Sequence, residues 1–346
     1  MKAHQRELLS LEEVREVSRQ FGLRRPIEAE PIGRGSRSSA KSSLRTPGGR
    51  FMLKRRAADM GGADRLSFLH AFQLHLSDAG VPVPRVVRTP MGTTSVVGPL
   101  GTYELFEWVD GARWTQRLAE AAAIGAALGS MLKSSRSFVP GPHVPAISYH
   151  RAGTFEGAAP AIIAAAMRAD PDTNEVALRT CTDVLLERGA RAYARVESVG
   201  LDDVDRLCVH GDTHPGNALF DSGNVRALLD FDSARLDHRA CEAANALVHF
   251  GNDPIAGVPP ERWRAELDLQ RMAALVSGIG HGMGAMLQQR ERKALPWLMI
   301  ESCTLESIVP IARTGRFAHL RADGFLAFIE RKTAWIEANA QLIESL

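Results

Sequence analysis

The sequence predicts an α+β protein in two parts: a small N-terminal part with an antiparallel sheet and a helix, and a larger, mainly helical part. Two candidate strands, 40–44 and 50–54, flank a turn at 46–49, a pattern typical of a β-hairpin. After residue 116, long Ala- and Leu-rich stretches repeat with helical spacing. The 346 residues are 45% hydrophobic and 24% charged, so the chain is long enough for two lobes with ample core.

Charge balance and cysteine usage restrict the partners of the protein. The chain has 42 Lys and Arg against 40 Asp and Glu and lacks a long basic block, which argues against nucleic-acid binding. The cysteines form no CxxC pair, so neither a zinc site nor a disulfide framework is indicated, and a reducing cytoplasm is the expected location. The charged N-terminus has no signal-peptide core. The longest nearly apolar run, Ala158–Met167, is shorter than the roughly 20 residues that span a bilayer, so no membrane partner is expected.

The N-terminal part begins with a capping box, Ser10 and Glu13, which predicts a short helix. A glycine- and serine-rich turn at 31–39 follows, and its backbone N–H groups suit phosphate oxygens. The candidate phosphate-binding residues in this turn are Gly33, Gly35 and Ser36.

The second strand of the hairpin is predicted to present two different faces. Alternation places Phe51 and Leu53 on one face and Met52 and Lys54 on the other. Residues 64–77 then predict an amphipathic helix whose apolar side chains face this lobe, and a proline-containing segment ends it.

The rest of the chain predicts one more strand and then helices. Residues 103–109 alternate weakly as a strand, and Asp110-Gly111 break it. Helices are expected over 116–133, 158–167, 174–197 and 324–346. Alternate glycines at 278–284 lack the lysine and the strand–loop–helix context of a phosphate loop, so close helix packing explains them better.

The most informative stretch, 207–232, reads LCVHGDTHPGNALFDSGNVRALLDFD. Its apolar runs predict a strand followed by a β-hairpin, with a sharply bent loop entering the hairpin. Phosphoryl transfer needs a carboxylate that orients and deprotonates a hydroxyl, together with oxygen ligands that hold Mg²⁺ on the phosphates. Asp212 suits the first role, and Asn217 and Asp230 suit the second.

Two other interpretations of this stretch remain open on the residues alone. The polar side chains can merely stabilise bends. Alternatively, Asp212-Thr213-His214 has the D-x-H pattern of a metallophosphoesterase. That chemistry needs further GD, GNH and GHxH segments downstream, and the nearest candidates, at 251–253 and 280–283, lack the histidines that these patterns require.

VHGDTHPGN followed by LLDFD resembles the Brenner-type motif of the aminoglycoside phosphotransferase and choline kinase superfamily, which is similar to the catalytic and metal-binding loops of protein kinases. The resemblance implies a two-lobe, protein-kinase-like α+β fold. It also implies that Asp212 is the catalytic base and that Asn217 and Asp230 bind the metal. The likeness covers most of the chain in outline, but its specificity is concentrated in residues 210–232.

The same resemblance implies how a nucleotide binds. Lys54 would hold the α- and β-phosphates, and backbone groups of Glu107 and Val109 would pair with adenine at a hinge. Kinases of this type usually carry a glutamate that pairs with the strand lysine, yet no glutamate occurs between Asp64 and Asp78. His70 or Gln73 is the expected substitute.

Several polar residues are expected to support the site. His210 would brace the loop, and Asp232 would have a metal-binding or structural role. Asp237 and Glu242 are more easily explained as loop supports than as a wall of the acceptor site. Glu301 and Glu306 are candidates for binding a cationic acceptor, although a solvated helix face is the commoner arrangement for such carboxylates.

The resulting prediction is a phosphotransferase that uses ATP and Mg²⁺ to phosphorylate a hydroxyl of a small molecule, such as an aminoglycoside, another amino sugar, homoserine or a choline-like compound. The N-lobe, residues 1–108, would bind the nucleotide. The C-lobe, residues 109–346, would hold the catalytic loop and the acceptor. The alternatives are a non-catalytic kinase-like protein or a protein kinase, and the absence of an A-P-E landmark disfavours the latter.

Overall fold

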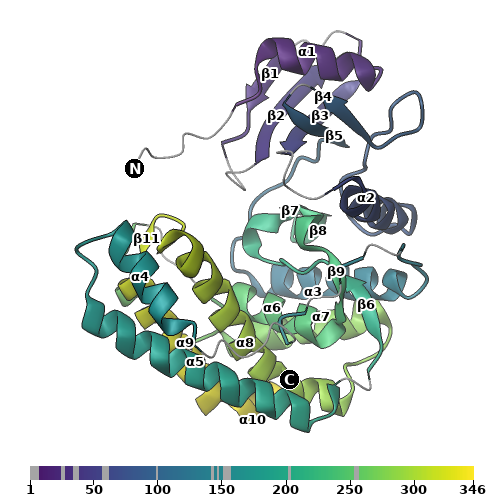
Figure 1. The fold of residues 1–346 in the computed structure, drawn as a ribbon. Helices are drawn as coiled ribbons and strands as arrows, with labels where there is room; N and C mark the ends of the chain where they lie inside the picture. Colours follow the sequence, from purple (N-terminus) through teal and green to yellow (C-terminus); the bar gives the residue numbers. More distant parts are fainter. Residues whose placement is uncertain are drawn as a thin grey trace.

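The structure is a computed structural model. It describes residues 8–24, 28–33, 39–56, 62–98, 100–141, 144–145, 148–150, 157–201, 204–252 and 257–346. Figure 1 shows a sheet-containing lobe above a larger helical lobe. The predicted fold class, a two-lobe kinase-like α+β protein, is therefore confirmed.

The smaller lobe is an antiparallel sheet covered by one helix. Within the described residues, five strands pair in the order β1-β2-β3-β5-β4. The elements are α1 (Leu11–Gln20), β1 (Glu28–Pro31), β2 (Ser39–Thr46), β3 (Gly49–Arg56), α2 (Ala63–Asp78), β4 (Ser95–Gly98) and β5 (Gly101–Glu107). The predicted capping box forms, because the Glu13 N–H donates to Ser10 Oγ and the Ser10 N–H donates to Glu13 Oε2, each at 3.1 Å.

The β2–β3 hairpin sorts its side chains as alternation predicts. Leu53 is fully buried in the core beneath α1, and Phe51 packs against that core. Met52 and Lys54 line a cavity on the opposite face. Lys41 on β2 is the direct cross-strand partner of Lys54, so the hairpin brings both lysines to the cavity side.

Helix α2 packs differently from the expectation that it faces the smaller lobe. Phe68, Leu69, Phe72 and Leu76 of α2 belong to the core cluster of the larger lobe. The ring of Phe72 lies 5.1 Å from that of Phe138 and 6.0 Å from that of Phe231. The expectation was wrong because tertiary contacts with aromatic rings of the larger lobe, which lie far from α2 in the sequence, fix its apolar face.

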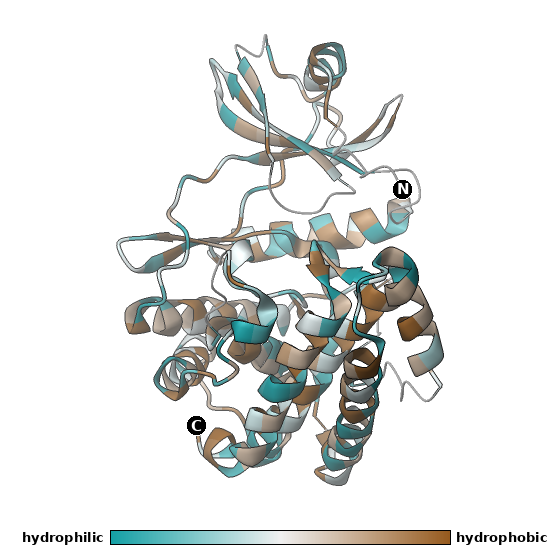
Figure 2. Cartoon of the chain, turned by 90° about the vertical axis from the view of Figure 1, so that its left-hand side faces the viewer, coloured by the Kyte–Doolittle hydropathy of each residue, from teal (hydrophilic) through white to brown (hydrophobic). Residues whose placement is uncertain are grey.

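The larger lobe combines helices with three short strand pairs among the described residues. Its helices are α3 (Leu118–Ser135), α4 (Ala159–Ala169), α5 (Glu175–Ser198), α6 (Arg239–Phe250), α7 (Leu269–Met283), α8 (Gln289–Thr314), α9 (Ala322–Ala338) and α10 (Ala340–Glu344). The strand pairs are β6 (Arg206–Val209) with β9 (Arg235–His238), β7 (Ala218–Asp221) with β8 (Asn224–Leu228), and β10 (Arg316–Phe317) with β11 (Leu320–Arg321). Figure 2 shows hydrophilic and hydrophobic residues alternating along these helices, as amphipathic packing requires.

The alternate glycines of α7 allow it to touch α3 closely. A Cβ atom added at Gly278 or Gly282 would collide with the backbone oxygens of Ala122 or Ala126 on α3. Close helix packing is therefore the role of Gly278 and Gly282, as the sequence predicted, whereas Gly284 ends α7 in a left-handed conformation. By length and composition α8 could cross a membrane, but 72% of its most apolar window is buried inside the chain, which is the behaviour of a core helix.

Candidate active site

The segment 210–217 forms a tight loop between β6 and β7. Gly211 adopts a positive φ of 77°, and a side chain there would collide with the guanidinium of Arg235 and the carbonyl of Ser233. A short 3-10 helix, η2 (Pro215–Asn217), closes the loop. The bent loop predicted from its glycines and proline is present, and it fixes the side chains that follow Gly211.

Asp212 lies at the wall of a cavity of about 860 Å³. We call this the acidic cavity, because Asp212 and Glu306 are the carboxylates among the described residues that line it. The Asp212 side chain is 44% exposed to the cavity but lies deep within the lobe. Burial raises the pKa of Asp212 to about 6, although His210 and His249 oppose this change. A carboxyl with such a pKa is suited to accept a proton near neutral pH.

Asn217 connects Asp212 to a second cavity of about 240 Å³ between the lobes. Its Nδ2 donates to the Asp212 carbonyl at 3.0 Å and to Asp212 Oδ2 at 3.3 Å, so the amide oxygen is not used in these bonds. Asn217 and Asp230 both line the second cavity, and Gly216 lines both cavities. The structure thus brings Asp212, Asn217 and Asp230 together where the two cavities meet.

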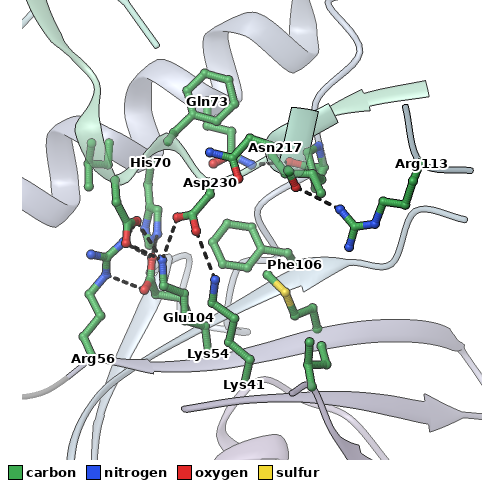
Figure 3. Close-up of a pocket in the computed structure, with 18 residues that line it drawn as sticks. Lys41, Lys54, Arg56, His70, Gln73, Glu104, Phe106, Arg113, Asn217 and Asp230 are labelled. Atoms are coloured by element: carbon green, nitrogen blue, oxygen red, sulfur yellow. Dashed lines mark hydrogen bonds and ion pairs between the residues drawn. The ribbon is translucent and has the colours of Figure 1, made fainter. Parts of the chain in front are cut away.

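The second cavity is rich in cations, and we call it the basic cavity. The cationic side chains in its lining are Lys41, Lys54, Arg56 and Arg113. Figure 3 shows Lys41 and Lys54 pointing toward Asp230 from the sheet of the smaller lobe. Lys41 Nζ lies 3.1 Å from Asp230 Oδ2, and Lys54 Nζ lies 3.4 Å from Asp230 Oδ1.

Asp230 has a left-handed backbone conformation, with φ 62° and ψ 71°, which is uncommon for a residue other than glycine. Burial alone would raise the pKa of its carboxyl, but Lys54 and Lys41 hold it well below its usual range. The carboxylate is therefore ionised and points at the cations of the basic cavity.

Lys54 also contacts Asp232, with both carboxylate oxygens 2.7 Å from Nζ. Arg56, two residues further along β3, joins Asp232 to Glu104 of β5. Burial would raise the pKa of Glu104, but His70, Lys54 and Arg56 lower it to about 2. Asp232 thus belongs to an ion-pair network at the edge of the basic cavity.

A buried glutamate, Glu104, lies on the strand next to Lys54, although α2 carries no glutamate. It is the direct cross-strand partner of Lys54, and its carboxylate is almost fully buried. His70 Nε2 lies 2.8 Å from Glu104 Oε2, and Gln73 donates to the Pro84 carbonyl at 2.6 Å. Arg56 and His70 therefore hold Glu104 in place. The carboxylates that contact Lys54 Nζ are those of Asp230 and Asp232, so neither His70 nor Gln73 substitutes for the helix glutamate.

The structure gives less information on two predicted nucleotide contacts, the hinge at Glu107 and Val109 and the glycine- and serine-rich turn at 31–39. Among its described lining residues the basic cavity includes Phe106, but neither Glu107 nor Val109. The backbone N–H of Glu107 donates to the Arg85 carbonyl at 2.9 Å. Gly33 is described and exposed. Gly35 and Ser36 lie outside the described residues, so their predicted contact with phosphate stays a prediction.

Two buried carboxylates, outside the lining of the acidic cavity, support the loop 210–217. Glu242 on α6 accepts the Gly211 N–H at 2.8 Å and the hydroxyl of Thr213. Asp237 accepts from Arg235 Nε at 2.9 Å, and Arg235 in turn donates to the Gly211 carbonyl at 3.0 Å. Both carboxylates are buried and neither lines the acidic cavity. Glu242 contacts the loop directly, and Asp237 acts on it through Arg235.

His210 and Glu301 occupy different surroundings. His210 Nε2 lies 2.8 Å from the Leu229 carbonyl and so ties the loop to the segment before Asp230. Glu301 is buried on α8 and faces His150, with both carboxylate oxygens 3.3 Å from Nδ1. The expectation of a solvated helix face was wrong for both residues, because α8 packs in the core. Glu301 is buried and does not line the acidic cavity, whereas Glu306 lines it with its side chain 24% exposed.

Sequence reasoning missed several residues of these cavities: Lys41, Arg56, Glu104, Tyr149, His249. A signal existed for Lys41, since hairpin register places it opposite Lys54. Glu104 stands between apolar residues of a strand, which marks a buried charge. Tyr149 and His249 carry no local signal, because only the folding of distant segments brings them to the acidic cavity.

The donor set beside the basic cavity fits Mg²⁺. The amide oxygen of Asn217 and the carboxylates of Asp230 and Asp232 are hard oxygen donors. The described part of the chain has no group of three or more His, Cys, Asp or Glu placed to hold a metal without help. Magnesium in kinase sites is typically held by one or two carboxylates together with phosphate oxygens, so the two observations agree.

A two-lobe kinase-like fold with a carboxylate, oxygen donors and a cation-lined cavity side by side defines a small-molecule kinase that acts on an alcohol group. A family model described as "Phosphotransferase enzyme family" (APH) matches residues 28–275. The match spans more than half of the chain, and the chain therefore belongs to this family, as the resemblance implied.

Known proteins similar to the chain are kinases. A homoserine kinase of Gluconacetobacter diazotrophicus is 28% identical over 265 residues, covering 75% of this chain and 74% of that protein. A microcompartment-associated aminopropanol kinase has a TM-score of 0.67 at 16% identity, with 97% and 99% of the two chains covered. An amicoumacin kinase in complex with AMP-PNP and Ca²⁺ has a TM-score of 0.65 at 15% identity, with 93% and 90% covered.

Proposed function

We propose that the protein transfers the γ-phosphoryl group of ATP, with Mg²⁺, to a hydroxyl of a small molecule bound in the acidic cavity. One observation carries the proposal: Asp212 faces the acidic cavity while its partner Asn217 lines the basic cavity with Asp230. A base beside one cavity and oxygen ligands beside the other suit transfer across the boundary between them.

Each group of residues would have one role in the transfer. Asp212 accepts the proton of the acceptor hydroxyl while that oxygen forms a bond to the γ-phosphorus and the bond to the ADP oxygen breaks. Lys54, Lys41 and Arg56 hold phosphate oxygens, leaving their present carboxylate partners to do so. Asn217 and Asp230 would hold Mg²⁺, which neutralises charge on the phosphates.

The charges of the acidic cavity favour an acceptor that is cationic or neutral. Its described lining contains Asp212 and Glu306 but no lysine or arginine. Burial and the neighbouring His249 and His210 lower the pKa of His214 to about 4, so this histidine is neutral at physiological pH. An acceptor carboxylate would find no lysine or arginine among these residues, whereas an ammonium group would be attracted.

A phosphorylation assay with three matched acceptors tests the proposal. 3-Aminopropan-1-ol has an amine and a hydroxyl, 1,3-propanediol lacks the amine, and L-homoserine adds a carboxylate. With ATP and Mg²⁺, we expect 3-aminopropan-1-ol to be phosphorylated fastest, 1,3-propanediol more slowly and L-homoserine most slowly. A wider panel of amino sugars and aminoglycosides extends the test to larger acceptors.

The readouts separate the class of reaction from the acceptor preference. If no hydroxyl compound in the panel is phosphorylated although ATP binds, the proposed function is wrong. If homoserine is the best of the three, phosphoryl transfer stands but the argument from cavity charge is wrong.

A further inference from the structure

Glu306 is an unusual residue in the acidic cavity because its carboxylate contacts four side chains from different parts of the larger lobe. Oε1 accepts from Asn245 Nδ2 at 2.6 Å, from the Tyr149 hydroxyl at 2.7 Å and from Ser302 Oγ at 3.2 Å. Oε2 lies 2.8 Å from His249 Nε2. Glu306 is thus a junction between α6, α8 and the segment around Tyr149.

Two of these contacts lead directly to the catalytic loop. Asn245 Oδ1 accepts the backbone N–H of Thr213 at 2.9 Å. The Tyr149 hydroxyl has one proton, which lies between Glu306 Oε1 at 2.7 Å and the carbonyl of Gly211 at 3.2 Å. Gly211 and Thr213 are the residues on either side of Asp212, so the loop is held on both sides of the base by groups that end on one carboxylate.

The other carboxylate oxygen of Glu306, Oε2, contacts His249 at the wall of the acidic cavity. Glu306 and its partner His249 both line the acidic cavity, and the imidazole of His249 lies 5.9 Å from that of His214. The side chain of Glu306 is 24% exposed and that of His249 is 28% exposed, so an acceptor can reach the pair. The carboxylate that holds the loop is therefore also part of the acceptor wall.

We infer that Glu306 is a positioning residue that acts through Tyr149 and Asn245 to hold Asp212 toward the bound acceptor. The inference rests on the proposed function, since it concerns the same reaction. Burial opposes the charge of Glu306, but His249, Tyr149 and Ser302 lower its pKa to about 2, so it is ionised at physiological pH. An ionised acceptor of hydrogen bonds holds its donors more strongly than a neutral one.

The inference predicts effects on kcat but not on nucleotide binding, because Glu306 does not line the basic cavity. Glu306→Gln keeps the shape but removes the charge and should lower kcat about tenfold, the loss expected when charged hydrogen bonds become neutral. Tyr149→Phe removes one link and should lower kcat several-fold, which provides a second test if the Glu306 variant folds poorly. The KM for ATP should stay unchanged in both variants.

A double-mutant cycle distinguishes positioning from a structural role. If Glu306 acts through Asp212, Glu306→Gln should change the residual kcat of Asp212→Asn by less than about twofold, since the group that it positions is gone. A purely structural carboxylate would instead reduce kcat by the same factor in both backgrounds. Glu337→Gln on α9 is the matched control: its side chain is 31% exposed and pairs with Arg188 and Arg191 far from the loop, and this change should leave kcat and both KM values unaltered.

The outcomes are separable from failure of the proposed function. Absence of phosphoryl transfer by the wild type with every acceptor would reject the function itself. Turnover by the wild type, together with an unchanged kcat in both Glu306→Gln and Tyr149→Phe, would reject the positioning role alone. Additive losses in the cycle would also reject it.

Discussion

The basic and acidic cavities meet at Gly216, yet their walls differ in charge. Among the described residues, four lysine and arginine side chains and three carboxylates line the basic cavity, whereas two carboxylates and no lysine or arginine line the acidic cavity. In the basic cavity, each carboxylate beside the sheet is paired with lysine or arginine, so these cations are held ready for a polyanion. In the acidic cavity, the carboxylates contact histidine, tyrosine and asparagine. The difference indicates that phosphates belong to one side of the catalytic loop and the acceptor to the other.

The largest expected effect comes from the residue at the boundary. Asp212→Asn removes the base but keeps the size of the side chain, and kcat should fall by about 10²–10⁴-fold, the usual contribution of a general base. Steady-state kinetics with saturating ATP and acceptor would measure this loss. Turnover within a few-fold of the wild type would mean that another group removes the proton.

A smaller effect is expected on the basic side. Lys54→Met and Lys41→Met each remove a charged contact to phosphate, so each should raise the KM for ATP by about 10–100-fold, in line with a hydrogen bond to a charged group. The KM for the acceptor should not change in either variant. If Lys41→Met leaves ATP kinetics unaltered, this lysine serves only to pair with Asp230.

The pH dependence of kcat/KM for the acceptor tests the raised pKa of Asp212 in the acidic cavity. Because the pKa of Asp212 is raised to about 6, its proton-accepting form is lost as the pH falls through that value. The kcat/KM for the acceptor should therefore decrease about tenfold per pH unit below this limb. A limb near the ordinary aspartate value of 3.8 would contradict the buried character of the base.

The smallest effect on catalysis should come from the glycines of α7. Gly278→Ala forces α7 away from α3 and should destabilise the fold by about 1–3 kcal/mol, the usual range for overpacking. The KM for ATP should stay unchanged, because neither cavity includes Gly278 in its described lining. A large rise in this KM would revive the interpretation of these glycines as a phosphate loop.

Sequence patterns predicted the local parts of the structure well. Hairpin alternation placed Lys54 on the cavity side, and the order of HGD, Asn and DFD predicted the meeting of Asp212, Asn217 and Asp230. These features depend on neighbours within a few residues or on one motif. The strand register and the bent loop therefore followed from short-range geometry.

Patterns failed where distant segments decide the outcome. The packing of α2 on Phe231, the buried Glu104 beside Lys54, and the inward direction of Glu301 all depend on tertiary contacts. Tyr149 and Glu306 are 157 positions apart, and no periodicity connects them. A buried polar network of this kind becomes visible only when the whole lobe is assembled.

Binding of a non-hydrolysable ATP analogue, measured by calorimetry with Mg²⁺, tests the division between the two cavities most directly. Asp212→Asn should bind the analogue as tightly as the wild type, whereas Asp230→Asn should lose most of its Mg²⁺-dependent affinity. Equal losses in both variants, or none in either, would contradict the assignment of phosphates to one side of the loop and the acceptor to the other.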